Sequence, residues 1–343
     1  MAANAALQRI RQSRNRETLF TFASRLPGLQ SEWWQSGLNA YELGVQFTRI
    51  SDAITQRLIQ LAIEDLGTPP IAFAWLACGS QGRCEQLAHT DQDNALILSQ
   101  PPNSMQGDYF QTLAARVTED LHTCGFTLCQ GGIMASNAEW CQPVEVWRNY
   151  FNQWIAHPDK RALMLANNFC DLRTITGSTG LLQSVLKPSF ASAQAHRRFI
   201  TALAAEALRS RPPHRLPFWL TLRRGRRIDL KQSGLMPIIA LARVLALECG
   251  CRHTHTRHRL QAVIGAGLLS RSNGTELIHA WDTLARLRLA HFDQQYQRLG
   301  RFSNQVRVAQ LPRQDQKALQ TAFASIRLMQ QWLAHRFSAE IVQ

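Results

Sequence analysis

The sequence has no uninterrupted apolar run of about 18 residues, the length from which a membrane-spanning helix is recognised. The first residues also lack the apolar core of a secretory signal, because arginines recur through them at positions 9, 11, 14 and 16. A basic amphipathic helix is the better interpretation of that stretch. We therefore expect a cytoplasmic protein with no membrane partner.

The eight cysteines do not form the dense, regularly spaced set of a disulfide-stabilised domain, so we expect free thiols. One pattern is similar to a metal site: Cys249, Cys251, His253, His255 and His258. A Cys-x-Cys pair is tighter than the usual zinc-ligand spacing. A loop between helices is the better interpretation, with Gly250 ending one helix and Thr254 or Thr256 capping the next.

Acidic residues are scarce, with 24 Asp and Glu against 38 Lys and Arg, which leaves a formal net charge of +14. This excess favours polyanionic partners such as nucleotides, nucleic acid or acidic protein surfaces, although an arginine-rich, well-solvated surface explains it equally well. The sequence has no aromatic-rich RNA-binding signature. Nucleic acid is therefore the weaker partner candidate, and a homodimer is compatible with the sequence.

The hydrophobic periodicity changes twice along the chain. Residues 5–65 have helical spacing, which Gly67 and the Pro69-Pro70 pair end. Buried strands are predicted at 71–78, 95–98, and 126–128 or 133–134, with a helix at 109–122. Beyond residue 139 we expect helices throughout, including one that Pro237 begins and a last one with an apolar core stripe. The predicted domains are 1–66, 67–180 and 181–343.

The segment WLACGSQGRCEQLAHTDQDNALIL at residues 75–98 carries the chemistry. A strand ends at Cys78, and Gly79 and Ser80 allow the backbone to turn closely around phosphate groups. Asp91 and Asp93 lie on one face of the next strand, because strand side chains repeat every second residue. Carboxylates that close repel each other unless a cation lies between them, and such oxygen ligands suit Mg²⁺ or Mn²⁺ together with substrate phosphates. The segment predicts metal-assisted transfer from a nucleoside triphosphate.

Neighbouring polar residues have candidate supporting roles. Arg83 is expected to hold a phosphate and Glu85 to orient Arg83, with a structural ion pair as the alternative for both. Thr90 and Asn94 flank the acids and are expected to fix their rotamers at the nucleotide site. His89 fits a solvent-facing loop histidine better than a base.

Three blocks, GSQGRCEQLAHTDQDNALIL, QGGIMASNAEW and RRIDLKQSGLMPIIALARVLAL, resemble bacterial nucleotidyltransferases related to protein-PII uridylyltransferase, within the polymerase-β-like superfamily. The resemblance covers about residues 35–337. It implies an α+β fold, with a small mixed-sheet nucleotidyltransferase domain between an N-terminal helical segment and a larger all-helical acceptor-binding domain. It also implies transfer of a nucleoside monophosphate, with UMP and AMP as candidates, to a protein or small-molecule hydroxyl in signal transduction.

Catalysts of that superfamily usually supply a third acid from a later strand. The corresponding stretch here, residues 126–136, contains no Asp or Glu. Other candidates follow it at Glu139, Glu145 and Asp171. Asp171, in NNFCDLRTITG, is the predicted catalytic residue, with a buried structural pair to Arg173 as the alternative.

Lys231 lies beside Asp229 and a basic segment that contains Arg223, Arg224, Arg226 and Arg227. Its ammonium group is expected to neutralise phosphate of the triphosphate or acceptor. A solvated charged face is the alternative. Since residues 126–136 supply no third acid, a second functional hypothesis is a weak or inactive module that binds Mg²⁺-nucleotide and a partner protein.

Overall fold

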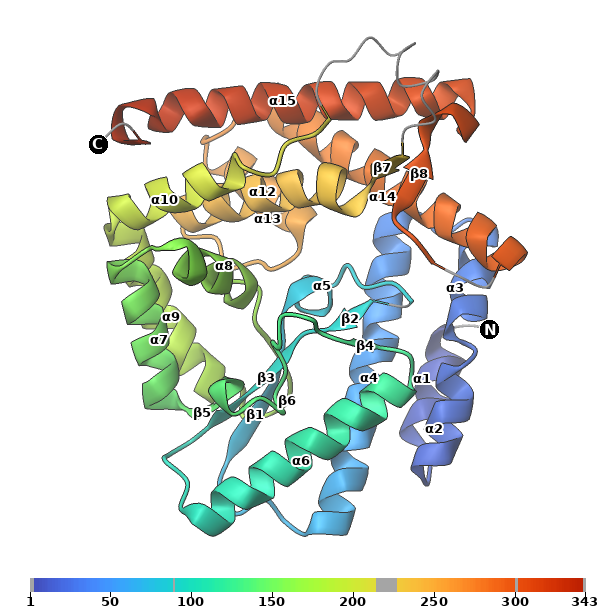
Figure 1. The fold of residues 1–343 in the computed structure, drawn as a ribbon, viewed down its shortest axis with the longest axis vertical. Coiled ribbons are helices and arrows are strands. Elements are labelled where there is room, and N and C mark those ends of the chain that lie inside the picture. Colours follow the sequence, from blue (N-terminus) through green and yellow to red (C-terminus); the bar gives the residue numbers. More distant parts are fainter. Residues whose placement is uncertain (1–2, 89, 214–226, 300–301, 342–343) are drawn as a thin grey trace. The chain divides into compact units, whose positions relative to one another are not determined.

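The computed structural model describes residues 3–88, 90–213, 227–299 and 302–341. The chain divides into two compact units, each described here by itself (Figure 1). The first comprises residues 1–38, 42–154 and 168–190, and the second residues 39–41, 155–167 and 191–343. His89 and the arginines at 223, 224 and 226 lie outside the described residues. The predicted three-part division of the chain stays a prediction.

The first unit begins with helices, as predicted. They are α1 (Ala3–Arg11), α2 (Arg16–Ala23), α3 (Leu26–Gln35) and α4 (Ala40–Leu66). Asn15 caps α2 by accepting the N–H of Thr18 at 3.0 Å. Gly67 ends α4 with a φ of +88°, a left-handed conformation that glycine adopts without steric cost. This confirms the predicted helical segment and its stop.

A four-stranded sheet forms the centre of this unit, in the order β5-β3-β1-β6. Its strands are β1 (Phe73–Ala77), β3 (Asn94–Leu98), β5 (Cys141–Pro143) and β6 (Arg173–Gly177). Strand β1 is antiparallel to β3 and β6, whereas β3 and β5 are parallel. Every residue of β1 and β3 is buried, in agreement with the apolar runs that predict these strands.

A separate parallel ribbon pairs β2 (Asp91–Gln92) with β4 (Thr127–Leu128). Helix α6 (Ser104–Thr123) connects β3 to β4 and begins with a reciprocal capping box between Asn103 and Gln106. The predicted strand at 126–128 is confirmed in position, but the prediction that it is buried is wrong, because both residues of β4 are exposed and it belongs to this ribbon rather than to the main sheet. Residues 133–134 form no strand.

The expectation of helices throughout the chain beyond residue 139 is wrong, because β5 and β6 complete the sheet there. Strand β5 has three residues, and β6 buries only Ile175 fully among its five. Neither strand contains the apolar run from which a buried strand is recognised. The other elements of this unit are α5 (Gly79–Gly82), α7 (Val144–Ala156), α9 (Thr179–Ala195) and a 3₁₀ turn at Ala138–Trp140, whereas α8 (Lys160–Phe169) belongs mostly to the second unit.

The second unit is mainly helical and confirms the α+β class. Its helices are α10 (Arg197–Ala207), α12 (Met236–Glu248), α13 (Thr256–Gly265), α14 (Arg271–Leu299) and α15 (Arg313–Ile341). Its smaller elements are β7 (Arg227–Asp229), the π-helix η2 (Lys231–Leu235), β8 (Gln305–Arg307) and a 3₁₀ turn at Val308–Gln310. The predicted core stripe of the last helix is buried at Ala322, Ile326, Met329, Leu333 and Phe337.

The cysteine- and histidine-containing segment after α12 is a loop between helices. Gly250 has a φ of +74°, as predicted for a helix stop. The cap of α13 is His255, not Thr254 or Thr256, because its Nδ1 accepts the N–H of Arg257 at 3.1 Å. Within the described ranges, no three His, Cys, Asp or Glu side chains gather in a way that could hold a metal ion. The loop interpretation is therefore the one that the structure supports.

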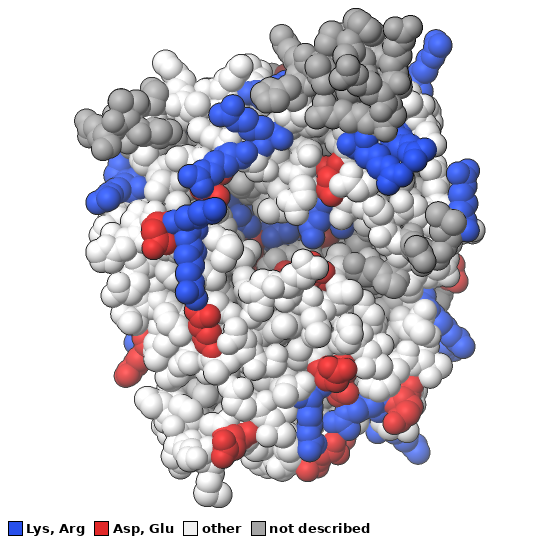
Figure 2. All heavy atoms as spheres, in the orientation of Figure 1, with Lys and Arg blue, Asp and Glu red and all other residues white. Residues whose placement is uncertain are grey.

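Basic side chains on the face shown in Figure 2 form separate groups with acidic side chains among them, rather than one continuous basic field. None of the described helices combines the length and the hydropathy that a membrane span requires.

Candidate active site

A glycine turn follows the central strand. Cys78 is extended, and Gly79 has a φ of +57° and starts the single helical turn of α5. The first hydrogen bond of this turn runs from the N–H of Gly82 to the carbonyl of Cys78, at 2.9 Å. As in the first turn of any helix, the preceding N–H groups, including those of Gly79 and Ser80, have no partner within the helix. Binding of phosphate by Gly79 and Ser80 stays a prediction.

The same turn lies against Asp93. A Cβ atom at Gly79 would overlap Asp93 Oδ2, so only glycine allows this approach. The main chains also meet here, because the N–H of Cys78 donates to the carbonyl of Asp93 at 3.0 Å. The structure therefore places the glycine turn, which the sequence predicts to bind phosphate, directly against Asp93, a predicted metal ligand.

Asp91 lies in β2, and Asp93 is the single residue between β2 and β3. Between them, the buried side chain of Gln92 donates to the carbonyls of Thr118 and Phe126 at 3.0 and 3.2 Å. Asp91 is exposed and Asp93 half-buried, whereas Gln92 is only 2 % exposed. This alternation is the period-two pattern on which the sequence prediction depends.

Each acid accepts a hydrogen bond from the segment that follows α6. The hydroxyl of Thr127 donates to Asp91 Oδ1 at 2.7 Å. The thiol of Cys129 donates to the carboxylate of Asp93. Burial and the negative charge of Asp93 raise the pKa of Cys129 to about 11, which keeps this thiol protonated at neutral pH.

The donor set fits a divalent cation that is shared with a ligand. The two carboxylates offer the hard oxygen atoms that Mg²⁺ and Mn²⁺ prefer. No third His, Cys, Asp or Glu joins them closely enough to complete a metal cage in the part of the chain that the structure describes. The remaining positions would be left for phosphate oxygens and water, as is usual for Mg²⁺.

Arg83 lies in a buried ion-pair cluster. Its Nε donates to Glu85 at 2.9 Å and its Nη1 to Asp171 at 2.8 Å, and the three side chains are 7, 8 and 0 % exposed. Desolvation lowers the pKa of the Arg83 guanidinium, but the two carboxylates raise it by more, so that it stays charged. The geometry favours the structural alternative for Arg83 and Glu85, and the phosphate-holding role of Arg83 stays a prediction.

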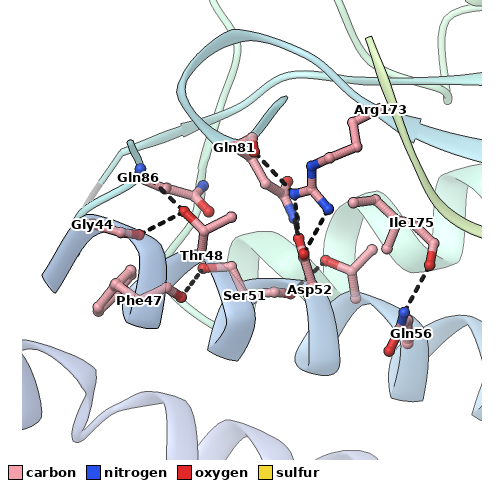
Figure 3. Close-up of polar contacts among 11 residues, drawn as sticks. Gly44, Phe47, Thr48, Ser51, Asp52, Gln56, Gln81, Gln86, Arg173 and Ile175 are labelled. Carbon is pink, nitrogen blue, oxygen red and sulfur yellow. Dashed lines mark hydrogen bonds and ion pairs between the residues drawn. The ribbon is translucent and has the colours of Figure 1, made fainter. Parts of the chain in front are cut away.

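Asp171 is part of this cluster and not a partner of Arg173, so the pairing expected from the sequence is wrong. A Cβ at Gly82 would overlap the carbonyl of Asp171, which shows how closely this segment packs on the glycine turn. Arg173 instead donates through Nη1 and Nη2 to Asp52 at 2.8 and 2.9 Å (Figure 3). The predicted catalytic role of Asp171 stays a prediction.

Helix α4 supports the turn through a second network (Figure 3). Asp52 accepts from the Gln81 amide at 3.0 Å, and Arg173 also donates to the Gln81 carbonyl at 3.0 Å. One turn earlier, Thr48 accepts the N–H of Gln86 at 3.3 Å. Sequence reasoning missed Asp52, although a carboxylate between buried residues of an amphipathic helix is a detectable signal.

Thr90 and Asn94 are buried and act on the backbone around the acids. Thr90 donates to the carbonyl of Leu87 at 2.9 Å. Asn94 donates to the Gln92 side chain at 3.1 Å and accepts the N–H of Ala135 at 2.7 Å. These contacts fix the strand that carries Asp91 and Asp93, whereas contact with a nucleotide stays a prediction for both residues.

Lys231 belongs to the second unit and is half-buried at the start of η2. The neighbouring Asp229 accepts the N–H of Gln232 at 2.7 Å and the side-chain amide of Gln305 at 3.1 Å. A cavity of about 920 Å³ lies elsewhere in this unit. Its lining comprises Leu208, Arg211, Pro212, Glu276, Thr321, Ala324, Ser325, Arg327, Leu328, Gln330, Gln331 and Ala334.

Comparison with known protein families assigns both units. Residues 24–161 match the family described as "Putative nucleotidyltransferase DUF294". Residues 197–337 match its companion, described as "Putative nucleotidyltransferase substrate binding domain". The chain belongs to this nucleotidyltransferase family. The resemblance inferred from the three sequence blocks is thereby confirmed, and no curated protein matches the chain.

In this nucleotidyltransferase, the first matched stretch contains the glycine turn and both strand acids, and the second contains Lys231. Asp171 and Arg173 lie between the two stretches. A nucleotidyltransferase takes a nucleoside triphosphate as substrate and generally uses a divalent metal ion.

Proposed function

We propose that the protein transfers a nucleoside monophosphate from a nucleoside triphosphate to a hydroxyl of a protein or small molecule, with Mg²⁺ as the metal. UMP and AMP are the candidate groups. The observation that carries this proposal is the position of the Asp93 carboxylate against Gly79, with Asp91 two residues earlier in β2. A glycine turn that can approach phosphate groups, with two carboxylates nearby that can hold a metal ion, suits a nucleoside triphosphate bound together with its metal ion.

In this reaction the acceptor hydroxyl attacks the α-phosphorus. A new P–O bond forms, the bond to the β-phosphate breaks, and pyrophosphate leaves with the electron pair. Asp91 and Asp93 would hold Mg²⁺, which when bound supplies positive charge to the phosphate oxygens. The N–H groups at the start of α5, with the Ser80 hydroxyl, would bind phosphate oxygens. The sequence predicts Asp171 as acceptor of the hydroxyl proton, a role that its buried ion pair with Arg83 opposes.

The test is nucleotide incorporation by a double variant, Asp91→Asn with Asp93→Asn. Purified protein is incubated with lysate and each labelled nucleoside triphosphate, and label transfer and pyrophosphate release are measured. We expect a loss of about 1000-fold, since metal stabilisation supplies several kcal/mol and about 1.4 kcal/mol is tenfold in rate. Asp108→Asn, at an exposed carboxylate on α6, is the matched control. Full activity of the double variant at unchanged thermal stability would refute the proposal.

A second candidate function is binding of Mg²⁺-nucleotide and a partner protein with little turnover. The engagement of Asp171 with Arg83 favours this candidate, because an acid held in a buried ion pair is a poor proton acceptor. It predicts stabilisation by Mg²⁺-nucleotide that follows RT ln(1 + [L]/Kd), without pyrophosphate release. An RNA acceptor has less support, since the sequence has no aromatic-rich RNA-binding signature.

A further inference from the structure

The ribbon of β2 and β4 aligns the two acids with two potential donors. Asp91 is opposite Thr127 and Gln92 is opposite Leu128 in parallel register. Asp93 follows directly after β2 and Cys129 directly after β4, so the second acid and the second donor both come one residue after the paired strands.

The contacts follow this register. The Thr127 hydroxyl donates to Asp91 Oδ1 at 2.7 Å, and the Cys129 thiol donates to the Asp93 carboxylate. Each acid thus receives one donor from the corresponding position of one neighbouring segment. A pair of donors matched residue by residue to a pair of acids indicates a shared task, whereas a single contact would not.

The chemistry of a carboxylate explains what these donors contribute. Its two oxygens offer about four acceptor positions, so a hydrogen bond to one of them leaves the others for a cation. The bond fixes the rotamer of the carboxylate and partly offsets the repulsion between the two charges. Outer partners of this kind orient metal ligands and commonly affect metal affinity by about 10- to 100-fold.

A purely structural role for this ribbon has little support. Thr127 is exposed, and the side chain of Leu128 between the two donors is 40 % exposed. Strand β4 has two residues, neither of them buried. Core packing therefore does not explain why a polar donor stands opposite each acid.

We propose that Thr127 and Cys129 are positioning residues, which hold Asp91 and Asp93 in the arrangement that binds the metal–nucleotide complex. This inference rests on the proposed function, since it assigns the two acids to that complex. Thr127 is expected to contribute more than Cys129, because a hydroxyl is a stronger donor than a thiol.

The experiment measures, by calorimetry, the Kd of the Mn²⁺ complex of α,β-methylene-UTP or α,β-methylene-ATP. Thr127→Val, which keeps the shape and removes the donor, should weaken binding by about 10-fold, and Cys129→Ala by a few-fold. The matched variants Thr127→Ser and Cys129→Ser keep a donor and should stay within about two-fold of the wild type. Thr127→Ala replaces Thr127→Val if the latter changes the melting temperature.

The outcomes separate this inference from the proposed function. Wild-type affinity in the Thr127 variants, or equal losses in Thr127→Ser and Thr127→Val, would overturn the positioning role alone. No binding by the wild type, or wild-type binding by Asp91→Asn with Asp93→Asn, would overturn the proposed function and this inference with it. Substitution with Co²⁺ gives a further check, because a sulfur-to-cobalt charge-transfer band would make Cys129 a ligand rather than a positioning residue.

Discussion

The carboxylates of the first unit have two kinds of partner: Asp171 pairs with a charged arginine, whereas Asp91 and Asp93 accept hydrogen bonds from neutral groups. Asp171 is fully buried and meets the positive charge of Arg83 at 2.8 Å. Asp91 is exposed and accepts from the neutral hydroxyl of Thr127. Asp93 is half-buried, accepts from a neutral thiol, and faces the glycine turn.

The difference distinguishes a carboxylate whose charge an arginine compensates from carboxylates that accept hydrogen bonds from a neutral hydroxyl or thiol. A buried carboxylate that already pairs with an arginine has its charge compensated, and removing either partner leaves an uncompensated charge. Neutral donors orient a carboxylate without cancelling its charge. We therefore expect Asp91 and Asp93 to attract a metal ion more strongly than Asp171, whose carboxylate is paired with Arg83.

The largest stability effect that would sharpen this contrast is expected at Asp171. Asp171→Ala should lower the free energy of unfolding by about 3–5 kcal/mol, because it leaves part of the Arg83 charge buried without its partner. Urea unfolding measures this change. Asp108→Ala, at an exposed site, should stay within about 0.5 kcal/mol. Unchanged stability of Asp171→Ala together with a loss of nucleotide transfer would show that Asp171 has a catalytic rather than a structural role.

A smaller stability effect, with a functional one, is expected at the glycine turn. Gly79→Ala should cost about 1–2 kcal/mol for its left-handed conformation, and the new methyl group must also displace the Asp93 carboxylate. The affinity for Mn²⁺-nucleotide should fall with it. Gly107→Ala, on α6 with open space around it, is the control and should stabilise the protein by about 0.5–1 kcal/mol. If Gly79→Ala binds Mn²⁺-nucleotide with wild-type affinity, the glycine turn does not take part in nucleotide binding.

The smallest effect is expected in the more exposed network on α4. Asp52→Asn weakens two charge-assisted bonds to Arg173, whose side chain is 27 % exposed. We expect a loss of about 1 kcal/mol in unfolding free energy, less than at Asp171, because solvent screens this pair. Chemical denaturation of Asp52→Asn and Asp171→Ala under the same conditions shows which variant loses more unfolding free energy. A cost at Asp52 equal to that at Asp171 would show that burial does not govern the contrast.

The sequence predicted those parts of the fold and site that depend on local patterns. The apolar runs of β1 and β3 identified both strands, whereas the common strand face predicted for Asp91 and Asp93 stays a prediction, because Asp93 lies between β2 and β3. The glycine turn was recognisable because its residues are consecutive. Strand β6 was missed since it lacks an apolar run, and its partner β1 is about a hundred residues away.

Long-range partners could not be predicted from local pattern. Arg83 and Asp171 are separated by 88 positions, and Asp52 and Arg173 by 121, so nothing local assigns either pair. The sequence favoured Arg173 for Asp171 because the two are close in the chain. Thr127 and Cys129 were missed because the search of that segment considered only acids, and their relevance depends on the register with β2.

The most direct test compares nucleotide binding by two variants under one condition. The Kd of the Mn²⁺ complex of α,β-methylene-UTP or α,β-methylene-ATP is measured for Asp91→Asn with Asp93→Asn and for Asp171→Asn, both at a temperature where they are folded. We predict that the strand variant loses binding and that Asp171→Asn stays within about three-fold of the wild type, since Asp171 pairs with Arg83. Loss of binding in Asp171→Asn, with wild-type binding in the strand variant, would contradict the account.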